Sequence, residues 1–359
     1  MNELDKAVQL FEEQRFDEAI LIYGKLIASE PDDAWLHHAI GLCFTQLNRH
    51  EEALASLDMA IRLSPNEGIF FYHFAIVFER TGDVELAIKA YERALELDDS
   101  LAVIWNSLAQ LYVKDKKVDN AINAYENLLK HHPENHHAKH MLLSLSGSNV
   151  TKATKEYIED YFDSASSYFD EHLKNNLNYK LPKDISSLTS SYLNKRSKVL
   201  DLGCGTGLVG KELSDLTCEI DGVDLSSKML EIANEKNIYS KLYEQDIYEF
   251  LLSVEDRVYD MVSAADLFIY IGSLETTFIE VSRILKDGGI FVFSTQDGDK
   301  DFSLLKTGRF AQSENYITKI AKSSGFTEII KNRVVIREEI GEYETGFLWL
   351  FSKKPRNLV

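Results

Sequence analysis

The chain has 359 residues, of which 45% are hydrophobic, and it carries a formal net charge of −19. This length suits two or more domains, and the large negative charge disfavours binding to nucleic acid. The sequence shows neither a run of about eighteen apolar residues nor the pattern of a signal peptide, so we expect a cytoplasmic protein that does not insert into membranes. Three scattered cysteines exclude a disulfide framework.

The first part of the chain repeats with a period of 34 residues (65 − 31 = 34). The positions in phase are prolines, small residues and aromatic or leucine residues: Pro31, Pro65 and Pro133; Ala19, Ala53, Ala87 and Ala121; Tyr23, Leu57, Tyr91 and Tyr125. Helix pairs that repeat in this way bury their apolar faces only by stacking on their neighbours. The pattern resembles tetratricopeptide repeats over roughly residues 2–134 and predicts an all-α solenoid of four helix pairs with a capping helix.

Such a solenoid implies a groove that binds other chains. The inner helices are expected to present polar side chains to this groove: His38, Tyr72, Arg80, Asn106, Gln110 and Lys114. Of these, Tyr72 and Asn106 are our candidates for contact with a partner, which is a substrate protein, a regulator or a second copy. The alternative is that these residues are ordinary solvated positions of a purely structural repeat.

The segment 131–140 holds five of the ten histidines. His136 and His140 are four residues apart, a spacing at which two helical side chains can bind a metal ion. No cysteine or acidic partner stands at a fixed spacing, so we predict no metal site and interpret the segment as a solvated cap over the last repeat. The polar stretch 144–149 predicts a linker that separates residues 1–147 from residues 148–359.

An aromatic-rich helical region follows the linker, with apolar residues at helical spacing: Tyr157, Tyr161, Phe162, Tyr168, Phe169 and Leu173. We predict that this region, residues 148–195, is a flap that closes over a ligand and excludes water. The alternative is that the aromatic side chains only pack against neighbouring elements. His172 is the only histidine after residue 150 and therefore the only imidazole base available in this half.

The stretch from Val199 to Gly207 combines a short buried strand with a glycine turn, and a helix from about residue 208 to 214 follows. This arrangement presents free backbone N–H groups to a ligand. The spacing of Gly205, Gly207 and Gly210 also fits the fingerprint for nicotinamide dinucleotides. However, Asp201 would repel a pyrophosphate, so the loop suits a positively charged ligand better.

Two further carboxylates end the next two predicted strands. Asp224 lies 21 residues after Gly203 (224 − 203 = 21), where a carboxylate can accept both hydroxyls of a ribose, and Asp246 follows a third strand. Together with the glycine loop, these residues resemble the class I S-adenosylmethionine-dependent methyltransferases over about 200 residues. The alternative is a Rossmann-like sheet whose glycines only close a turn.

The resemblance implies a Rossmann-like α/β domain with a seven-stranded sheet in residues 196–359 and S-adenosylmethionine as its cofactor. It assigns the methionine portion to Gly203, Gly205 and Gly207, the ribose to Asp224 and the adenine amino group to Asp246. Asp201 would orient the ammonium group of the cofactor. The remaining cofactor-binding candidates are Leu225, Met229, Ile247 and Tyr168.

The fourth predicted strand ends at Ala264, at the sheet edge where ligands lie. Asp266 is our candidate proton acceptor or orienting acid, and Tyr270 is the candidate hydrogen-bonding wall; with His172 they form the catalytic set. The alternative for Asp266 is a cap of the next helix. That helix, about residues 274–285, is expected to stop at the glycines 288 and 289.

The loop and helix that follow the fifth strand are expected to contribute Arg309, Gln312 and Tyr316 to the mouth of the site as substrate candidates. The last two segments, about residues 327–337 and 343–352, alternate in hydrophobicity and predict a strand pair that closes the sheet. One of these strands is expected to be antiparallel, as the resemblance implies.

We predict methyl transfer to an oxygen or nitrogen nucleophile, a reaction for which alignment of the reactants supplies much of the catalysis. Repeats fused to such a domain favour a protein or a carrier-bound substrate. Two alternatives stay open. In the first alternative, the chain is an interaction protein whose methyltransferase-like half only binds the cofactor. In the second, it is a nicotinamide-dependent enzyme.

Overall fold

The computed structural model describes residues 2–175, 179–339 and 342–355, and the chain divides into two compact units, residues 1–138 and 139–359. The sequence placed the boundary near residue 147. The structure assigns residues 139–147 to the second unit because they pack on it. His140 Nε2 lies 2.7 Å from the Gly308 carbonyl oxygen, and the Ser144 hydroxyl donates to the Leu305 carbonyl oxygen at 2.5 Å.

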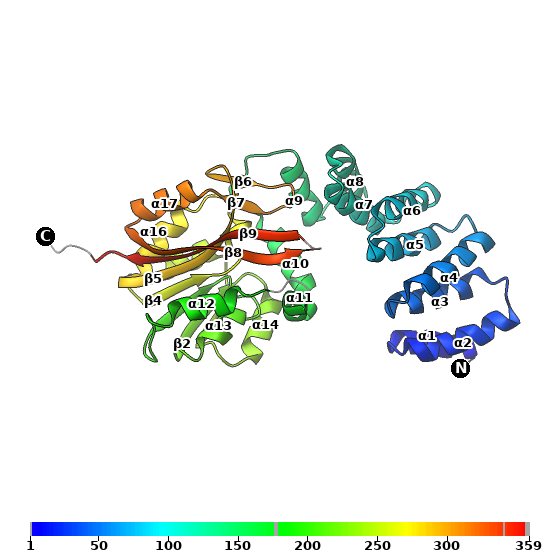
Figure 1. Ribbon diagram of the computed structural model, residues 1–359, viewed down its shortest axis with the longest axis horizontal. Coiled ribbons are helices and arrows are strands. Elements are labelled where there is room, and N and C mark those ends of the chain that lie inside the picture. The colour runs from blue at the N-terminus through cyan, green and yellow to red at the C-terminus, as the bar shows by residue number, and fades with distance from the viewer. Residues whose placement is uncertain (1, 176–178, 340–341, 356–359) are drawn as a thin grey trace. The chain divides into compact units, whose positions relative to one another are not determined.

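The first unit is a stack of antiparallel helix pairs (Figure 1). In the described residues these are α1 (Glu3–Glu12), α2 (Phe16–Ser29), α3 (Ala34–Gln46), α4 (His50–Leu63), α5 (Gly68–Thr81), α6 (Val84–Leu97), α7 (Ala102–Lys114) and α8 (Val118–His131), followed by α9 (His136–Leu145). The predicted helix pairs are therefore confirmed. The alanines in phase are fully buried, which explains the repeat: Ala19, Ala53, Ala87 and Ala121.

A small residue is needed where the two helices of a pair cross. At Gly41 on α3, an added Cβ atom would lie 2.9 Å from Leu57 Cγ on α4, closer than packed carbon atoms approach. Ala75 and Ala109 occupy the equivalent positions of the next two repeats and are fully buried. The repeat period thus reflects helix packing.

The second unit contains a seven-stranded sheet in the order β3-β2-β1-β4-β5-β9-β8. Its strands are β1 (Lys198–Leu202), β2 (Glu219–Asp224), β3 (Lys241–Glu244), β4 (Tyr259–Ala264), β5 (Leu285–Gln296), β8 (Phe326–Glu339) and β9 (Glu342–Lys353). The first five strands are parallel, whereas β9 is antiparallel to both β5 and β8. This arrangement confirms the predicted α/β fold and the closing strand pair.

The predicted glycine stop after α16 (Glu275–Ile284) is wrong in detail, because residues 286–289 belong to strand β5. The register between β4 and β5 shifts here, from Tyr259↔Leu285 to Met261↔Ile290. Gly288 has a φ of +79°, a conformation that glycine adopts without strain. The glycine pair therefore forms an irregularity at the start of the strand.

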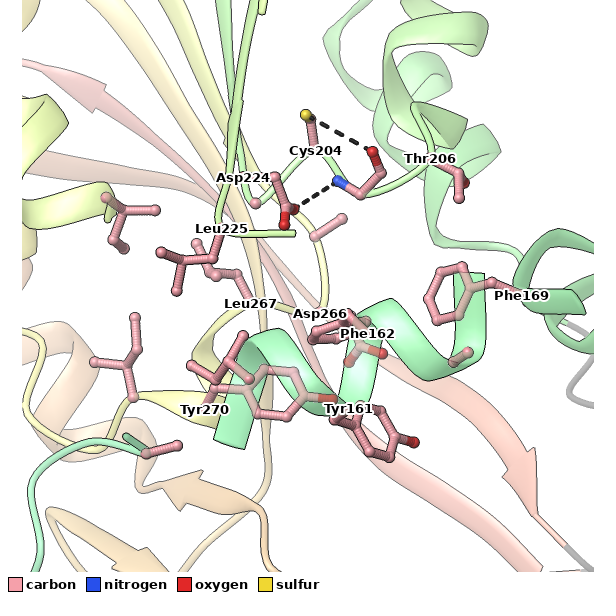
Figure 2. A pocket seen from close by; sticks show the side chains of 18 of the residues that line it. Tyr161, Phe162, Phe169, Cys204, Thr206, Asp224, Leu225, Asp266, Leu267 and Tyr270 are labelled. Atoms are coloured by element: carbon pink, nitrogen blue, oxygen red, sulfur yellow. Dashed lines mark hydrogen bonds between the residues drawn. The ribbon is translucent and has the colours of Figure 1, made fainter. Parts of the chain in front are cut away.

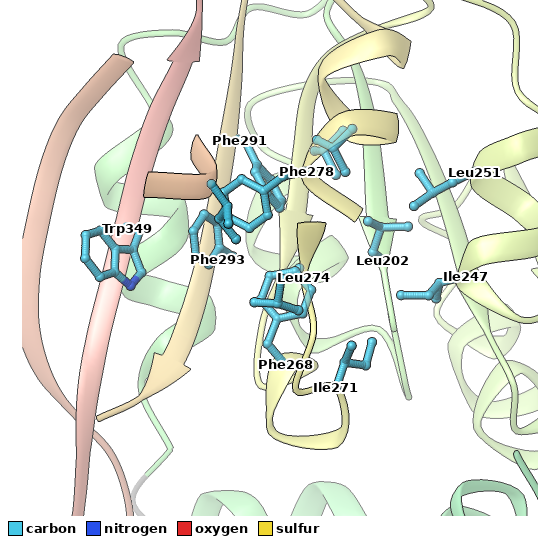
Figure 3. Close-up of a cluster of buried hydrophobic side chains, with 14 of the residues drawn as sticks. Leu202, Ile247, Leu251, Phe268, Ile271, Leu274, Phe278, Phe291, Phe293 and Trp349 are labelled. Carbon is cyan, nitrogen blue, oxygen red and sulfur yellow. The ribbon is translucent and has the colours of Figure 1, made fainter. Parts of the chain in front are cut away.

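Helices cover both faces of the sheet (Figure 1). On one face, α12 (Leu181–Thr189) and α13 (Leu208–Leu213) pack with apolar residues of β1, β4 and β9. The other face carries α15 (Ile247–Ser253), α16 and α17 (Glu314–Ser323). Figure 3 shows the buried aromatic side chains there: Phe268, Phe278, Phe291, Phe293 and Trp349. The helix α14 (Ser227–Glu235) follows β2.

The predicted flap, residues 148–195, has two separate parts. The residues of α10 (Lys155–Ala165), η1 (Ser166–Tyr168) and α11 (Phe169–Asn175), which we call the helical cover, lie near the carboxyl ends of the strands. In contrast, α12 packs on the sheet through Leu181 and Ile185, which are fully buried. The remaining elements are η2 (Phe268–Tyr270) and an unpredicted hairpin, β6 (Phe302–Leu304) with β7 (Phe310–Gln312).

Candidate active site

A cavity opens at the carboxyl ends of β1, β2 and β4, between these strand ends and the helical cover (Figure 2). It brings together most of the predicted site residues: Gly203, Gly205, Asp224, Leu225, Asp246, Ile247, Tyr168, Asp266, Tyr270 and Arg309. These residues come from the glycine loop, the turns after β2, β3 and β4, the cover and the loop before β7. The carboxyl edge of an open α/β sheet is where ligands bind.

The three glycines of the loop have left-handed backbones, with φ of +64° at Gly203, +52° at Gly205 and +87° at Gly207. A Cβ atom at Gly205 would meet nothing within 4 Å, so this position borders open space in the cavity. A Cβ atom at Gly207 would instead lie 2.8 Å from the Tyr239 ring. Gly207 is not among the cavity-lining residues, so packing against Tyr239 explains this glycine, and its contact with a ligand stays a prediction.

Cys204 also lines the cavity and is 7% exposed. Burial and the nearby Asp224 raise the pKa of its thiol well above the usual value, so at neutral pH it is a small apolar side chain.

Asp201 lies behind the glycine loop and does not line the cavity. Tyr239 donates its hydroxyl to Oδ2 at 2.8 Å, and Ser263 donates its hydroxyl to Oδ1 at 2.8 Å. The carboxyl is 1% exposed, and burial raises its pKa to about 6. Both carboxylate oxygens thus accept hydroxyl groups of the protein, and the expected role of Asp201 in orienting the ammonium group of the cofactor stays a prediction.

Asp224 connects β2 to the glycine loop. Its Oδ2 accepts a hydrogen bond from the Gly205 N–H at 2.8 Å (Figure 2), and its Oδ1 accepts one from the Ser226 N–H at 3.0 Å. Burial raises the pKa of this carboxyl. Leu225 lines the cavity beside it, whereas Met229 is fully buried inside α14 and takes no part in the lining. The prediction for Met229 is therefore wrong.

Asp246 begins α15 and lines the same side of the cavity. Its Oδ1 accepts hydrogen bonds from the backbone N–H groups of Tyr248 at 2.8 Å and Glu249 at 3.4 Å. Its Oδ2 lies 3.9 Å from Lys152 Nζ. The cap fixes the carboxylate at the rim, next to the apolar side chain of Ile247.

The helical cover is held over the glycine loop by two carboxylates that the sequence analysis missed. Asp163 accepts the Ser226 hydroxyl at 2.6 Å. Asp170 accepts the Thr206 hydroxyl and, at 2.7 Å, the Lys236 ammonium. Among many exposed acidic residues in helices, nothing in the local pattern distinguishes these two.

The chain that leads into the cover is tied to the end of β4. Ala153 donates its N–H to the Tyr270 carbonyl oxygen at 2.9 Å, and Gly272 donates its N–H to the Thr151 carbonyl oxygen at 2.8 Å. The cover then places aromatic side chains around the cavity (Figure 2): Tyr161, Phe162, Tyr168 and Phe169. The helical cover thus lines the cavity with aromatic side chains, and its closure over a ligand stays a prediction.

The cavity lining also contains a charged pair, Asp266 and Arg337. Asp266 follows β4 and accepts a hydrogen bond at Oδ2 from Arg337 Nη1 at 2.5 Å. Both residues line the cavity, and Arg337 is only 3% exposed. Asp266 caps no helix, because η2 has no side-chain cap. Sequence analysis placed Arg337 at the end of a strand and missed its role.

Comparison with known families agrees with this geometry. Residues 200–293 match the model described as a methyltransferase domain, and residues 10–68 and 72–131 match two models described as tetratricopeptide repeats. The chain contains a methyltransferase domain. The matched residues include the glycine loop, Asp224, Asp246 and Asp266 of the cavity.

The relatives of this chain include several methyltransferases. A malonyl-[acyl-carrier protein] O-methyltransferase of Halalkalibacterium halodurans is 28% identical over 169 residues, which are 45% of this chain and 62% of that protein. One of Priestia megaterium is 36% identical over 119 residues, or 31% and 41% of the two chains. A ubiquinone biosynthesis O-methyltransferase of Burkholderia pseudomallei is 24% identical over 154 residues, or 41% and 65%. The chain spans less than two thirds of the length of these relatives.

The cavity of the methyltransferase domain suits a nucleoside. Asp224 and Asp246 stand at adjacent strand ends, where carboxylates can accept hydrogen bonds from ribose hydroxyls and from an amino group. The open space next to Gly205 allows a ligand to approach the backbone closely. Leu225 and Ile247 add apolar surface against which a base can pack.

Two substrate candidates of the methyltransferase domain lie in its interior. Tyr316 is 2% exposed; its hydroxyl donates to Glu275 at 2.7 Å and accepts the Leu274 N–H at 2.7 Å. Gln312 is fully buried and donates to the carbonyl oxygens of Phe268 at 2.9 Å and Ile271 at 2.7 Å. Neither lines the cavity, so both predictions are wrong: these side chains join η2 and α16 to β7 and α17.

Arg309 does line the cavity, and its loop rests on the second half of α9. At Gly308, with φ of +80°, an added Cβ atom would lie 2.8 Å from Met141 Sδ. His140 is 3% exposed, and its ring stacks on Tyr157 with a centroid separation of 4.0 Å. The expectation of a solvated cap is therefore wrong for this half of the helix.

His172 lies on α11, but its side chain is outside the part of the chain that the structure describes. In the first unit, Tyr72 and Asn106 are half-buried on the inner helices α5 and α7. His38, in contrast, is 7% exposed and packs against His73 and Phe70. It therefore belongs to the repeat core.

The described residues contain no group of three or more histidine, cysteine or acidic side chains that could hold a metal ion. Over the same residues, no helix combines the length and apolarity needed to cross a bilayer.

Proposed function

We propose that this chain transfers a methyl group from S-adenosylmethionine to an oxygen or nitrogen nucleophile. The observation that carries the proposal is a cavity lined by Asp224, Asp246 and Asp266 together with aromatic side chains of the helical cover. S-adenosylmethionine supplies a methyl group already activated on a sulfonium. The protein therefore has to bind and align the reactants and to exclude water from them.

Asp224 accepts hydrogen bonds from the ribose hydroxyls in this proposal, and Asp246 accepts one from the adenine amino group. The glycine loop, at Gly203 and Gly205, faces the methionine portion. Leu225 and Ile247 pack against the base, and Tyr168 completes the site from the cover. Each of these residues lines the cavity, which supports the assignment.

On the acceptor side, Asp266 accepts the proton that the nucleophile loses while its bond to the methyl carbon forms and the carbon–sulfur bond breaks. The electron pair of the broken bond remains on sulfur. Tyr270 forms the adjoining wall, and Arg309 is one of the cations that line the same cavity. A positioned general base adds about 10²- to 10⁴-fold to such a reaction.

Two observations support an oxygen nucleophile on a protein-bound substrate. The relatives named above are all described as O-methyltransferases, and two of them act on a malonyl-[acyl-carrier protein]. Tetratricopeptide repeats bind other chains, so the first unit of this chain is proposed to dock the substrate protein, or another partner protein, through Tyr72 and Asn106.

Cofactor with a labelled methyl group, incubated with cell extract and the full chain, tests the proposal. We expect labelling by the wild type and by Asp215→Ala, which alters an exposed carboxylate, and a loss of about 100-fold or more with Asp224→Ala. No label above the Asp224→Ala background contradicts methyl transfer and favours an interaction protein. If the double variant Tyr72→Ala/Asn106→Ala labels the same macromolecule equally well, docking by these residues is wrong.

A further inference from the structure

Arg337 is a buried cation whose position depends on a β-bulge. The register of β8 with β9 shifts from Val335↔Thr345 to Arg337↔Glu344, so that two residues of β8 oppose one residue of β9. As a result, the neighbours Ile336 and Arg337 are both buried, at 1% and 3% exposure. In a regular strand one of them would face solvent, because side chains alternate. Bulges often redirect a side chain next to an active site.

The redirected guanidinium lies against Asp266. Arg337 Nη1 donates to Asp266 Oδ2, and this carboxyl side chain is 18% exposed and lines the cavity (Figure 2). Its Oδ1 is buried without a hydrogen-bond partner in the described residues. The Asp266 backbone has a φ of +55°, and its N–H donates to the Ser294 hydroxyl at 2.8 Å. Aspartate tolerates this left-handed conformation better than most residues.

We propose that Arg337 is the positioning residue of this active site: it fixes the Asp266 carboxylate at the acceptor end, so that Asp266 takes a proton from an O–H or N–H acceptor. The inference rests on the proposed methyl transfer. Arg337 itself touches neither reactant in this scheme and acts only through Asp266.

The groups around the pair are neutral or hold other contacts. Tyr179 and Tyr270 lie within electrostatic reach of Asp266, and burial raises the pKa of each phenol well above its usual value, so both are neutral. Glu344, the cross-strand neighbour of Arg337 on β9, accepts a hydrogen bond from Gln296 at 2.8 Å. Arg309 lines the same cavity, but the guanidinium that donates to the Asp266 carboxylate is that of Arg337.

The first test is the steady-state kinetics of labelled methyl transfer by full-chain variants. We expect Arg337→Met to lower kcat by about tenfold or more while the KM for S-adenosylmethionine stays at its wild-type value, and Arg337→Lys to restore part of kcat. Both variants should bind S-adenosylhomocysteine with wild-type affinity in calorimetry. A wild-type kcat in Arg337→Met would overturn the inference.

A double variant separates positioning from folding. Arg337→Met alone leaves a buried carboxylate without its partner, which can prevent folding, but Asp266→Asn/Arg337→Met removes both charges. Because Arg337 acts through Asp266, the double variant should transfer methyl groups at the rate of Asp266→Asn alone. A further loss of tenfold or more in the double variant would show that Arg337 acts independently, and the inference would be wrong.

Crystal structures of the variants keep the test independent of turnover. We expect the Asp266 carboxylate to leave its wild-type position in Arg337→Met and to keep it in Arg337→Lys. If the wild type transfers no methyl group, the proposed function fails while these structures still report on Arg337. An Asp266 carboxylate in its wild-type position in Arg337→Met would contradict the inference.

Discussion

Gly205 and Gly207 share a left-handed backbone but have different surroundings. An added Cβ atom meets nothing within 4 Å at Gly205, whereas at Gly207 it lies 2.8 Å from the Tyr239 ring. We expect Gly205→Ala to lower stability by only about 1–2 kcal/mol, the cost of the left-handed backbone, and to weaken binding of S-adenosylhomocysteine because the methyl group enters the cavity.

Gly207→Ala is expected to lower stability more, by about 2–4 kcal/mol, because a clash with a buried ring adds to the backbone cost. Urea unfolding and calorimetric titration measure the two effects separately. Similar affinity losses at similar stability in both variants would contradict the distinction between a ligand-facing and a packing glycine.

The histidine pair in the repeat core predicts acid sensitivity. His73 Nδ1 lies 3.0 Å from the Ile69 carbonyl oxygen and must therefore donate, which leaves His38 Nε2, 2.9 Å away, as an acceptor. Burial, followed by the effect of His73, lowers the pKa of His38 to about 4, and burial also lowers the pKa of His73. Both imidazoles are therefore neutral in the folded repeats.

In the unfolded chain, His38 takes up a proton as the pH falls below about 6.5, the ordinary pKa of histidine. In the folded chain its pKa is about 4, so it stays neutral until the pH approaches that value. The free energy of unfolding of the first unit should therefore be steady above about pH 7. From about pH 7 to about pH 5 it should fall by about 2 kcal/mol from His38 alone. Urea unfolding followed by Trp35 fluorescence measures this loss. His37→Asn, on the same helix, should leave it unchanged, and His38→Phe should reduce it.

The strand-end carboxylates could be predicted from sequence because fold topology fixes where strand ends lie. Asp224 ends β2, Asp246 and Asp266 come two residues after β3 and β4, and all three line the cavity. Arg337 could not be predicted, since its burial depends on a bulge that changes the side-chain alternation. Similarly, no local pattern shows that Tyr239 and Ser263 satisfy the carboxylate of Asp201 behind the loop.

At the scale of elements, the helical cover is held mainly by polar contacts to the glycine loop and α14. Asp170 accepts the Lys236 ammonium, and both side chains are partly buried, at 28% and 20% exposure. Asp170→Asn should weaken this contact by about 1 kcal/mol. Because the cover then opens more easily, we expect S-adenosylhomocysteine to dissociate about fivefold faster. Stopped-flow displacement measures the rate.

Asp215→Asn, which changes an exposed carboxylate at the end of α13, is the matched control for that experiment. It should leave the dissociation rate unchanged. If Asp170→Asn also dissociates at the wild-type rate, the cover is not what retains the ligand, and other walls of the cavity hold it.

Helices and central strands could be predicted because their periodic patterns are long. The repeat helices and β1 to β5 follow the predicted order. The hairpin of β6 and β7 is too short, at three residues a strand, to produce a readable alternation. The helix α12 has the same amphipathic pattern as the cover helices, and only the tertiary structure shows that its apolar side packs on the sheet.

At the scale of the whole molecule, the two units have separate apolar cores. One core contains Leu10, Tyr23 and Phe44 of the repeats, and the other contains Phe278, Phe291 and Trp349 around the sheet. We therefore expect two thermal unfolding transitions. A ligand that binds only the folded second unit stabilises it by about 2.7 kcal/mol at 100 times its dissociation constant.

Differential scanning calorimetry with S-adenosylhomocysteine measures this effect. The transition of the second unit should move to higher temperature, while that of the repeats should stay in place. Trp35 and Trp105 fluorescence report the repeats, and Trp349 reports the sheet. A single transition that moves as a whole would show that the two units unfold together.

The labelling rate of the Cys204 thiol can report how often the active site opens. Of the three cysteines, Cys43 and Cys204 are buried and Cys218 is exposed, so a maleimide dye should label Cys218 at once in the native protein. Cys204 lies in the glycine loop and lines the cavity next to the helical cover. In a Cys43→Ala/Cys218→Ala protein, the slow labelling of Cys204 would therefore time each opening of the active site, without any substrate being known.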